Sequence, residues 1–426
     1  EMIDRSKSPH TQFPEQSRLP QVHETEVGKA RLHLLGGAEE PACRLTLLFD
    51  GSYPELGNSA ELGLLATQWP DATLNTDAAT LARKLDNMGA RVSMSVRPHM
   101  LGMDVAMLCR KSKDILSLVG EILSSPRFDE RALEVSKVRA KTSLEISRRQ
   151  MANVAMLNLG PLLFGKGHPL ARQNEAADFD GVTVEKLVAM HRRIYTQSGC
   201  HSYLCGQLDE ATVEATEALL KAIPDTAPAI SPDIRPMRPK EPQTIISRHC
   251  EAVQSAIASG IPTISRQHPD YHALRLAVMA LGGYFGSRLM SNIREKKGLT
   301  YGISALLLGD REGSHATITA QCDNGYAGRV VEEIRNEIKA LADNPPSGDE
   351  LERMRLHAVS DSLEALDTPF SIMKVIVSQY AVGMPDNYFQ RQQEVIASID
   401  SDTIGEMARR YLSADSLRIS IAGNPG

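Results

Sequence analysis

Arg294 and Tyr301 lie seven residues apart, where helix-forming residues give way to strand-forming ones. An arginine presents a fork of N–H donors that can hold a carbonyl or a carboxylate. A tyrosine hydroxyl can donate to the oxyanion that forms when water attacks a peptide carbonyl. We predict that a helix carries Arg294, that Gly298 ends this helix, and that Tyr301 begins the next strand. This unit can aim both side chains at one point, although a surface arginine and a half-buried tyrosine would give the same spacing.

A proline-rich stretch divides the chain into two halves. Residues 224–242 contain six prolines and few large apolar residues, which excludes a helix or a central strand and predicts an extended linker. The predicted organisation has four parts: an N-terminal extension at 1–19, a domain at 20–223, the linker at 224–242 and a second domain at 243–426.

The order of predicted elements is similar in the two halves. The first half has an opening strand at 45–49, a helix at 78–88, strands at 91–96 and 102–107, and helices at 113–123 and from 129 onward. The second half has an opening strand at 255–259, a helix at 287–297, strands at 301–308 and 316–321, and helices at 328–341 and from 349 onward. This order indicates an internal duplication. It predicts an α+β fold of two homologous layered domains, each a mainly antiparallel sheet with helices packed on one face.

The sequence around Arg294 and Tyr301 resembles a known family. The string Ile293-Arg294-Glu295-Lys296-Lys297-Gly298-Leu299-Thr300-Tyr301-Gly302, with Leu281-Gly282-Gly283 before it, is similar to the C-terminal half of the insulinase/pitrilysin metallopeptidases, the inverzincins. It also resembles subunits of the mitochondrial processing peptidase, and residues 164–170 are similar to that family's FG-x-x-HPL segment. The resemblance implies that Arg294 and Tyr301 bind substrate and support the transition state, across a chamber from a zinc ion held by the N-terminal half.

The zinc-binding motif of that family is missing from this chain. These enzymes bind zinc through H-x-x-E-H on an N-terminal helix, with a further glutamate downstream. The corresponding stretch places Glu61, Leu64 and Leu65 at the His, Glu and His positions, and two leucines can neither bind a metal nor move a proton. Glu145 matches the downstream glutamate, but one carboxylate does not make a zinc site, so we interpret it as an exposed helix residue.

Two other groups of metal-ligand residue types have structural explanations. His268 and His272 have helical spacing, but Pro269 and Asp270 between them indicate a helix start with Asp270 as its N-cap. Cys200, next to His201, and Cys205 share a predicted strand, whose alternation places the two cysteines on opposite faces. Neither group therefore predicts a metal site.

Glycines and cysteines add two exclusions. Gly282, Gly283 and Gly286 lack the G-K-[ST] ending of a phosphate loop, so we do not expect nucleotide binding. Six cysteines are too few for a disulfide-stapled scaffold of 426 residues, and most lie in apolar runs typical of buried free thiols.

Composition excludes other function classes. The net charge of −6, with acids and bases spread along the chain, does not indicate a nucleic-acid partner. No apolar run is long enough to span a membrane. The polar start, with Met2 after Glu1, has no apolar signal core, so we expect a cytoplasmic protein, or a periplasmic one if a signal peptide has been removed.

These features predict the non-zinc subunit of a heteromeric metallopeptidase. Its expected partners are a zinc-bearing homologous subunit and a peptide or unfolded polypeptide substrate, and a homodimer is possible when the chain is isolated. We expect no cofactor in this chain and zinc in the partner. The alternative is a non-enzymatic scaffold or core subunit, or a peptide-binding subunit, of a larger complex.

Overall fold

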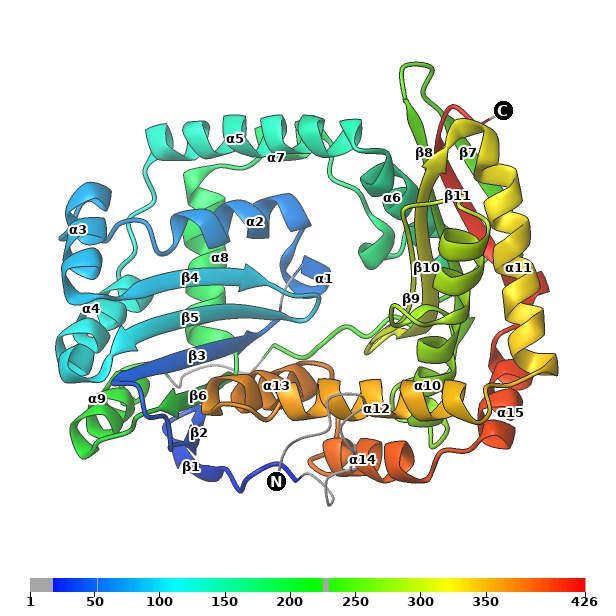
Figure 1. Ribbon diagram of the computed structural model, residues 1–426. Coiled ribbons are helices and arrows are strands. Elements are labelled where there is room, and N and C mark those ends of the chain that lie inside the picture. Colours follow the sequence, from blue (N-terminus) through cyan, green and yellow to red (C-terminus); the bar gives the residue numbers. More distant parts are fainter. Residues whose placement is uncertain (1–17, 52, 225–229, 426) are drawn as a thin grey trace, which may run out of the picture.

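The computed structural model describes residues 18–51, 53–224 and 230–425, arranged as two halves that stand side by side (Figure 1). Most of the predicted N-terminal extension and part of the predicted linker lie outside the described residues. Among the described residues, no helix is both long enough and apolar enough to cross a membrane.

The first half is built on a six-stranded sheet of order β1-β2-β6-β3-β5-β4, in which β2 and β6 are parallel and the other pairs antiparallel. Its strands are β1 (His23–Val27), β2 (Ala30–Leu35), β3 (Ala42–Asp50), β4 (Arg91–Val96), β5 (Met100–Leu108) and β6 (Cys200–Gly206). Its helices are α1 (Tyr53–Leu56), α2 (Ser59–Gln68), α3 (Ala78–Met88), α4 (Ser112–Ser124), α5 (Glu130–Arg149), α6 (Met151–Phe164), α7 (Ala176–Asp180), α8 (Val184–Gln197) and α9 (Glu210–Lys221).

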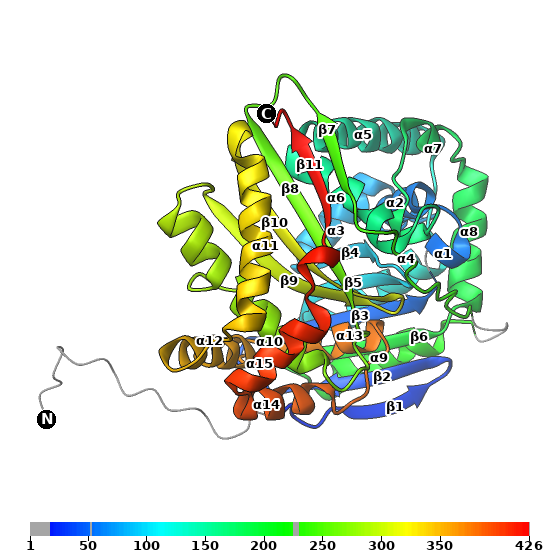
Figure 2. The same cartoon turned by 90° about the vertical axis from the view of Figure 1, so that its right-hand side faces the viewer.

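The second half has a five-stranded sheet of order β7-β11-β8-β10-β9, in which β7 and β11 are parallel (Figure 2). Its strands are β7 (Thr244–Arg248), β8 (Gln254–Thr263), β9 (Gly302–Asp310), β10 (Gly313–Asp323) and β11 (Arg418–Gly423). Its helices are α10 (Tyr271–Gly282), α11 (Ala327–Asp343), α12 (Asp349–Glu364), α13 (Pro369–Ala381), α14 (Tyr388–Ser398) and α15 (Ser401–Tyr411), with a π-helix, η3 (Met290–Lys296). The two sheets match strand for strand once β1 is set aside, which confirms the predicted fold class.

Local sequence explains the boundaries of these elements. The helix predicted at 78–88 is α3: the Asp77 side chain accepts the Thr80 N–H at its start, and Gly89 ends it in the left-handed conformation, with φ 67°. In β3, alternation sends Leu45 and Leu47 into the core under the first half's own helices, whereas Leu48 faces the opposite side.

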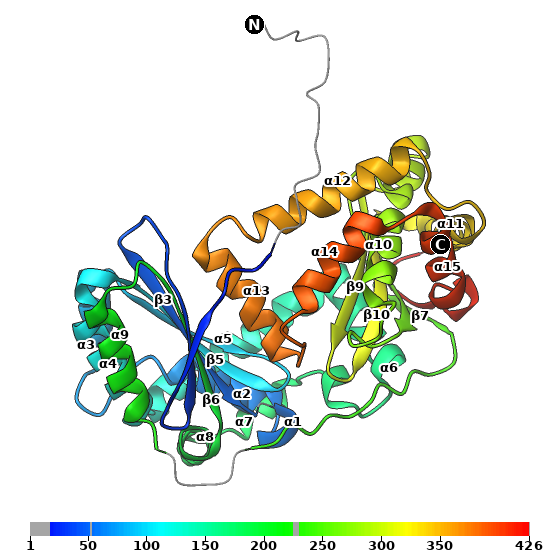
Figure 3. The same cartoon turned by 90° about the horizontal axis from the view of Figure 1, so that it is seen from below.

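The two halves exchange helices, an arrangement that the prediction of helices on one face of each sheet did not include. The helix α6 of the first half covers the second sheet, where Leu159, Leu162 and Leu163 pack on alanines of β8 and β11. Small residues let the helix approach closely, since a Cβ at Gly260 would lie 2.9 Å from a Leu163 methyl group. Seen from below, α12 runs out of the second half and leads into α13, which lies against the first sheet (Figure 3). There Met373 and its neighbours pack on Leu48 and other residues of that sheet.

The described part of the predicted linker, residues 230–242, forms no helix or strand but is fastened at several points. The Arg238 N–H donates to the Phe164 carbonyl at 3.0 Å, and the His168 imidazole donates to the Arg235 carbonyl at 2.7 Å. A Cβ at Gly165, whose φ is 97°, would lie 2.7 Å from the Arg238 carbonyl oxygen. The segment that resembles FG-x-x-HPL thus holds the linker in place.

The β4–β5 turn and the β9–β10 turn meet at a buried seam between the halves. His99 donates through Nδ1 to Glu55 at 2.8 Å and through Nε2 to Glu312 at 2.5 Å. Burial lowers the pKa of His99, but the hydrogen bonds to Glu312 and Glu55 outweigh burial and raise the pKa to about 9. The two contacts of His99 therefore link Glu55 in the first half with Glu312 in the second.

Candidate functional site

The expected zinc-motif positions lie on α2, and the two that hold leucines are packed into the core. Leu64 and Leu65 are buried in the core of the first half, together with Leu62 and Trp69. The Trp69 indole donates to the Ile122 carbonyl at 3.1 Å, which fixes the end of this helix against α4. No ligand atom is present on the two leucines, so α2 cannot build the zinc site that the motif builds elsewhere.

Glu61 has taken a structural role at the start of α2. Its backbone N–H is capped by Asn58 at 2.8 Å, and its carboxylate returns to the Asn58 N–H at 3.5 Å, which completes a capping box. Its other oxygen lies 3.2 Å from the Lys186 ammonium on α8. Glu145, the candidate downstream ligand, is exposed on α5. The structure thus brings no metal-binding set together at these positions.

The Arg294–Tyr301 unit differs from the predicted regular helix. Residues 290–296 form the π-helix η3, and the Lys297 N–H donates to the Asn292 carbonyl, five residues back, at 3.0 Å. Gly298 then turns the chain with φ 60°, and its N–H donates to the Arg294 carbonyl at 3.2 Å, the pattern of an αL helix end. Tyr301 comes one residue before β9 rather than inside it.

Tyr301 and Arg294 differ in how far they are exposed to solvent. Tyr301 is 88% exposed, an unusual state for a tyrosine in a folded domain. Arg294 is half-buried, and its guanidinium lies 4.8 Å from the ring centroid of Phe285, which is itself exposed. In the described part of the chain no ion pair engages Arg294, and no hydrogen bond joins it to Tyr301. Sequence reasoning missed Phe285, although its place just before Gly286 in the same string could have indicated it.

A groove of about 640 Å³ runs from Tyr301 along the face of the second sheet. Small and polar side chains form much of its wall, including Ala258 of β8, Ser304 of β9 and Thr319 of β10. The helix α6 contributes Met156 to the opposite wall. Beside the groove, β9 pairs with β10 alone and is the edge strand of the described sheet. Arg294 does not line this groove, so the structure brings one of the two predicted residues to it.

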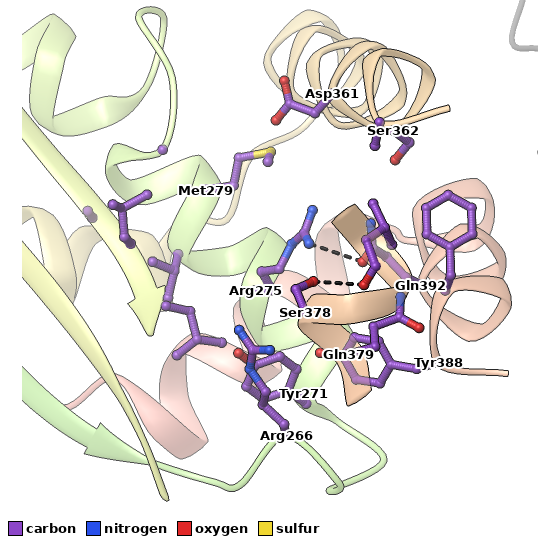
Figure 4. Close-up of a pocket in the computed structure, with 18 residues that line it drawn as sticks. Arg266, Tyr271, Arg275, Met279, Asp361, Ser362, Ser378, Gln379, Tyr388 and Gln392 are labelled. Carbon is purple, nitrogen blue, oxygen red and sulfur yellow. Dashed lines mark hydrogen bonds between the residues drawn. The ribbon is translucent and has the colours of Figure 1, made fainter. Parts of the chain in front are cut away.

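A second cavity, of about 440 Å³, lies apart from both predicted residues, between α10, α12, α13 and α14 (Figure 4). Arg266 and Arg275 line it, and Arg275 donates to the Gln392 side chain at 3.1 Å. These arginines also act on neighbouring His272. Burial, followed by repulsion from Arg275 and from other arginines, lowers the pKa of His272 to about 4. The cavity wall carries both arginine side chains and the carboxylate of Asp361.

The remaining predicted groups have structural roles. Asp270 lies at the N-cap position of α10 as predicted, but its side chain does not cap. Its carboxylate instead accepts from the Tyr411 hydroxyl at 2.6 Å and pairs with Arg410 at 3.0 Å, so α15 diverts it. His272 stacks on Tyr388, with ring centroids 4.5 Å apart.

Two further predictions concern cysteines and glycines. Cys200 and Cys205 belong to hydrophobic clusters on opposite faces of the first sheet, which confirms the predicted alternation. Five of the six cysteines are buried and all six are free thiols. A Cβ at Gly282 would lie 2.7 Å from Ala305, so this glycine serves the close packing of α10 on β9.

This chain combines two halves with matching sheets, an exposed Tyr301 beside an edge strand, and leucines at the expected zinc-motif positions. Residues 181–356 match the family model described as the peptidase M16 inactive domain. A protein named as the non-peptidase homolog YmxG of Helicobacter pylori is 20% identical over 416 residues, covering 96% of this chain and 93% of that protein.

Solved structures share the fold. The peptidase M16 inactive domain from Pseudomonas fluorescens superposes with a TM-score of 0.86 at 22% identity, covering 96% of this chain and 98% of that one. The periplasmic protease PqqL from Escherichia coli gives a TM-score of 0.78 at 13% identity over 98% of this chain, which spans about half (47%) of that longer chain. The chain is therefore similar to the inactive domain of M16 peptidases, in sequence over residues 181–356 and in fold over nearly its whole length.

Proposed function

We propose that this chain is the non-zinc subunit of a heteromeric M16-type peptidase and supplies Arg294 and Tyr301 to a partner's zinc site. The observation that carries the proposal is an asymmetry between the two halves. Tyr301 is 88% exposed beside an open groove, whereas Leu64 and Leu65 are packed into the core. Exposing a tyrosine stabilises nothing in the isolated chain, so we infer that its hydroxyl has a use outside the chain.

The groove suits an extended peptide. An unpaired strand edge offers alternating N–H and C=O groups, to which a peptide can add as a further strand. The groove floor beside β9 has small side chains such as Ala258 and Ser304, which leave room for the peptide's own side chains. Main-chain pairing is independent of peptide sequence, so the expected substrates are extended or unfolded segments rather than one defined motif.

Arg294 and Tyr301 would then have separate roles in peptide hydrolysis. A zinc ion held by the partner subunit would activate the attacking water. The Tyr301 hydroxyl donates to the oxyanion of the tetrahedral intermediate, and the Arg294 fork holds a carbonyl of the bound peptide. Phe285, stacked under the guanidinium, limits the conformations that Arg294 can adopt. Closure of the partner against this chain must bring Arg294 to the groove, because it does not line the groove here.

The test is reconstitution. The chain is purified with the nearest zinc-motif homologue from the same genome, and hydrolysis of an unstructured peptide is measured for each protein alone and for the mixture. We expect activity in the mixture only. Tyr301→Phe should lower kcat by about 10²–10³, the usual cost of removing one oxyanion donor. Arg294→Ala should raise KM.

Tyr326→Phe is the matched control, since Tyr326 is also exposed but lies in the turn before α11. Activity of this chain alone would refute the proposal. Activity of the mixture that is indifferent to both substitutions would support the second candidate, a scaffold or peptide-binding subunit. That candidate is favoured by the tight fastening of linker and exchanged helices, which suits a rigid core subunit.

The compartment is part of the proposal. We propose the cytoplasm, with the periplasm as the alternative if the natural chain carries a leader. Cell fractionation with an antibody to the chain distinguishes the two.

A further inference from the structure

The seam between the two hairpin turns holds more acidic groups than its one imidazole can balance. Asp310 is the last residue of β9, and Glu312 lies in the β9–β10 turn and contacts the His99 imidazole. Glu55 of α1 contacts the other nitrogen of that imidazole. The Nδ1 or Nε2 atom of His99 and one carboxylate oxygen each of Asp310 and Glu312 all lie within 4.8 Å of one another. His99 and Glu312 are buried, and Asp310 is half-buried.

A second observation points to a missing positive charge. Glu312 accepts from His99 through Oε1, but its Oε2 atom is also buried and has no hydrogen-bond partner among the described residues. A buried carboxylate oxygen without a donor is costly, and a bound ion is one of the arrangements that satisfy such a group in native proteins. Hydrogen bonding within the cluster does not account for Oε2, because Nε2 of His99 is already committed to Oε1.

The orientation of His99 matches that of a metal-binding histidine. A metal-ligating imidazole typically donates its other ring N–H to a carboxylate, which fixes its tautomer and direction. Glu55 plays this part at Nδ1, at 2.8 Å, and its own position is fixed because Oε1 also accepts the Asp233 N–H of the linker at 3.0 Å. The Nε2 atom then faces the carboxylates across the seam.

We propose that His99 Nε2, Glu312 and Asp310 bind a divalent transition-metal cation, which fastens the two halves at their hairpin turns. The cation takes the place of the Nε2 proton, and Glu55 orients the imidazole without binding the metal. One imidazole and two carboxylates suit Zn²⁺, which accepts nitrogen and oxygen ligands in a four-coordinate site. Mg²⁺ and Ca²⁺ prefer oxygen ligands alone. This site uses both halves of the chain and none of the α2 positions, so it differs from the zinc site of the active peptidases.

The test is metal binding by the full chain. The protein is treated with a chelator and dialysed against Zn²⁺, Mn²⁺ or Mg²⁺, and bound metal is measured by elemental analysis. We expect about one Zn²⁺ per chain, little Mg²⁺, and a zinc-dependent rise in melting temperature. Replacement by Co²⁺ should give the visible absorption of a four-coordinate site. Glu312→Gln and His99→Gln should each weaken zinc binding at least tenfold.

Two further variants keep the test decisive. Asp310→Asn removes a half-buried ligand but leaves the His99 bridge intact, so it should fold and still bind zinc at least tenfold more weakly. His33→Gln is the control, because His33 has a carboxylate at 3.6 Å, that of Glu24, but belongs to no three-ligand group among the described residues. Failure to bind zinc, or zinc binding unchanged by Asp310→Asn, would overturn the proposal and leave the seam as a proton-bridged contact.

Discussion

The Glu61 carboxylate lies 3.2 Å from the Lys186 ammonium, and this ion pair ties α2 to α8 at the position that the sequence resemblance assigns to a zinc-binding histidine. In this chain the position therefore serves as a contact between helices. At the other two positions that the resemblance assigns to the motif, Leu64 and Leu65 are core residues.

Restoring the motif should therefore unfold the chain rather than activate it. The triple variant Glu61→His, Leu64→Glu, Leu65→His places an uncompensated carboxylate at a buried position and deletes two core side chains. We expect a loss of at least about 3–5 kcal/mol of unfolding free energy. Urea denaturation measures this loss. A stable triple variant that binds zinc would show that the core tolerates the site.

A smaller side chain on the buried face of α6 should destabilise both halves together. The Leu159 side chain of α6 is fully buried against the second sheet, so Leu159→Ala should lower the unfolding free energy by about 2–5 kcal/mol. Because α6 belongs to one half and covers the other, we expect a single shifted transition by both tryptophan fluorescence, which reports on Trp69, and circular dichroism. Met156→Ala, on the exposed part of the same helix, is the control and should change little. Two separate transitions would contradict this coupling.

His272 should make the fold sensitive to acid. Its pKa is about 4 in the folded chain and about 6.5 in an unfolded one, so the unfolded state takes up the proton first as pH falls. The contribution of His272 to the unfolding free energy is therefore at its full value above pH 6.5 and falls by up to about 3 kcal/mol as the pH decreases to 4. His272→Phe should flatten the pH dependence of unfolding free energy in this window. The exposed His23→Gln control should leave it unchanged, and equal slopes for wild type and His272→Phe would refute the assignment.

The turn after η3 should require glycine. With φ 60° at Gly298, an alanine would be strained, and we expect Gly298→Ala to cost about 1–2 kcal/mol. The turn also sets the direction of Tyr301, so reconstituted peptidase activity should fall more than stability alone explains. Gly325→Ala, at a position with open space and no positive φ, serves as the control. Equal effects of the two substitutions on both stability and activity would count against this role.

The sequence predicts most of the helices and strands, but it does not predict all of the residues and elements that pack against them. Asp77 and Gly89 are local cues, so the bounds of α3 could be predicted from residues within the helix and beside it. The apolar face of α6 could also be predicted, but periodicity does not say which sheet will cover that face. The sequence likewise gave no indication that His99 and Glu312, 213 residues apart, would meet, because polar residues in hairpin turns are ordinary.

Within the candidate site, the apolar nature of Leu64 and Leu65 was decisive, because a leucine side chain has no alternative chemistry. The details around Arg294 were harder to predict. A π-turn differs from an α-turn by one carbonyl acceptor, and no residue type marks that choice. Asp270 shows a related limit: its position at the N-cap was predictable, whereas its capture by Tyr411, 141 residues away, was not.

Because the two halves exchange helices, the first sheet can be completely covered only late in synthesis of the chain. The inner face of the first sheet, with Leu48 and Tyr203, stays uncovered until α13 has emerged, which requires synthesis to pass residue 381. During that interval the nascent chain presents an apolar surface and has the greatest need of a chaperone. A gene split at the linker would make two products that must trade helices before either sheet is covered, and this favours keeping both halves on one polypeptide.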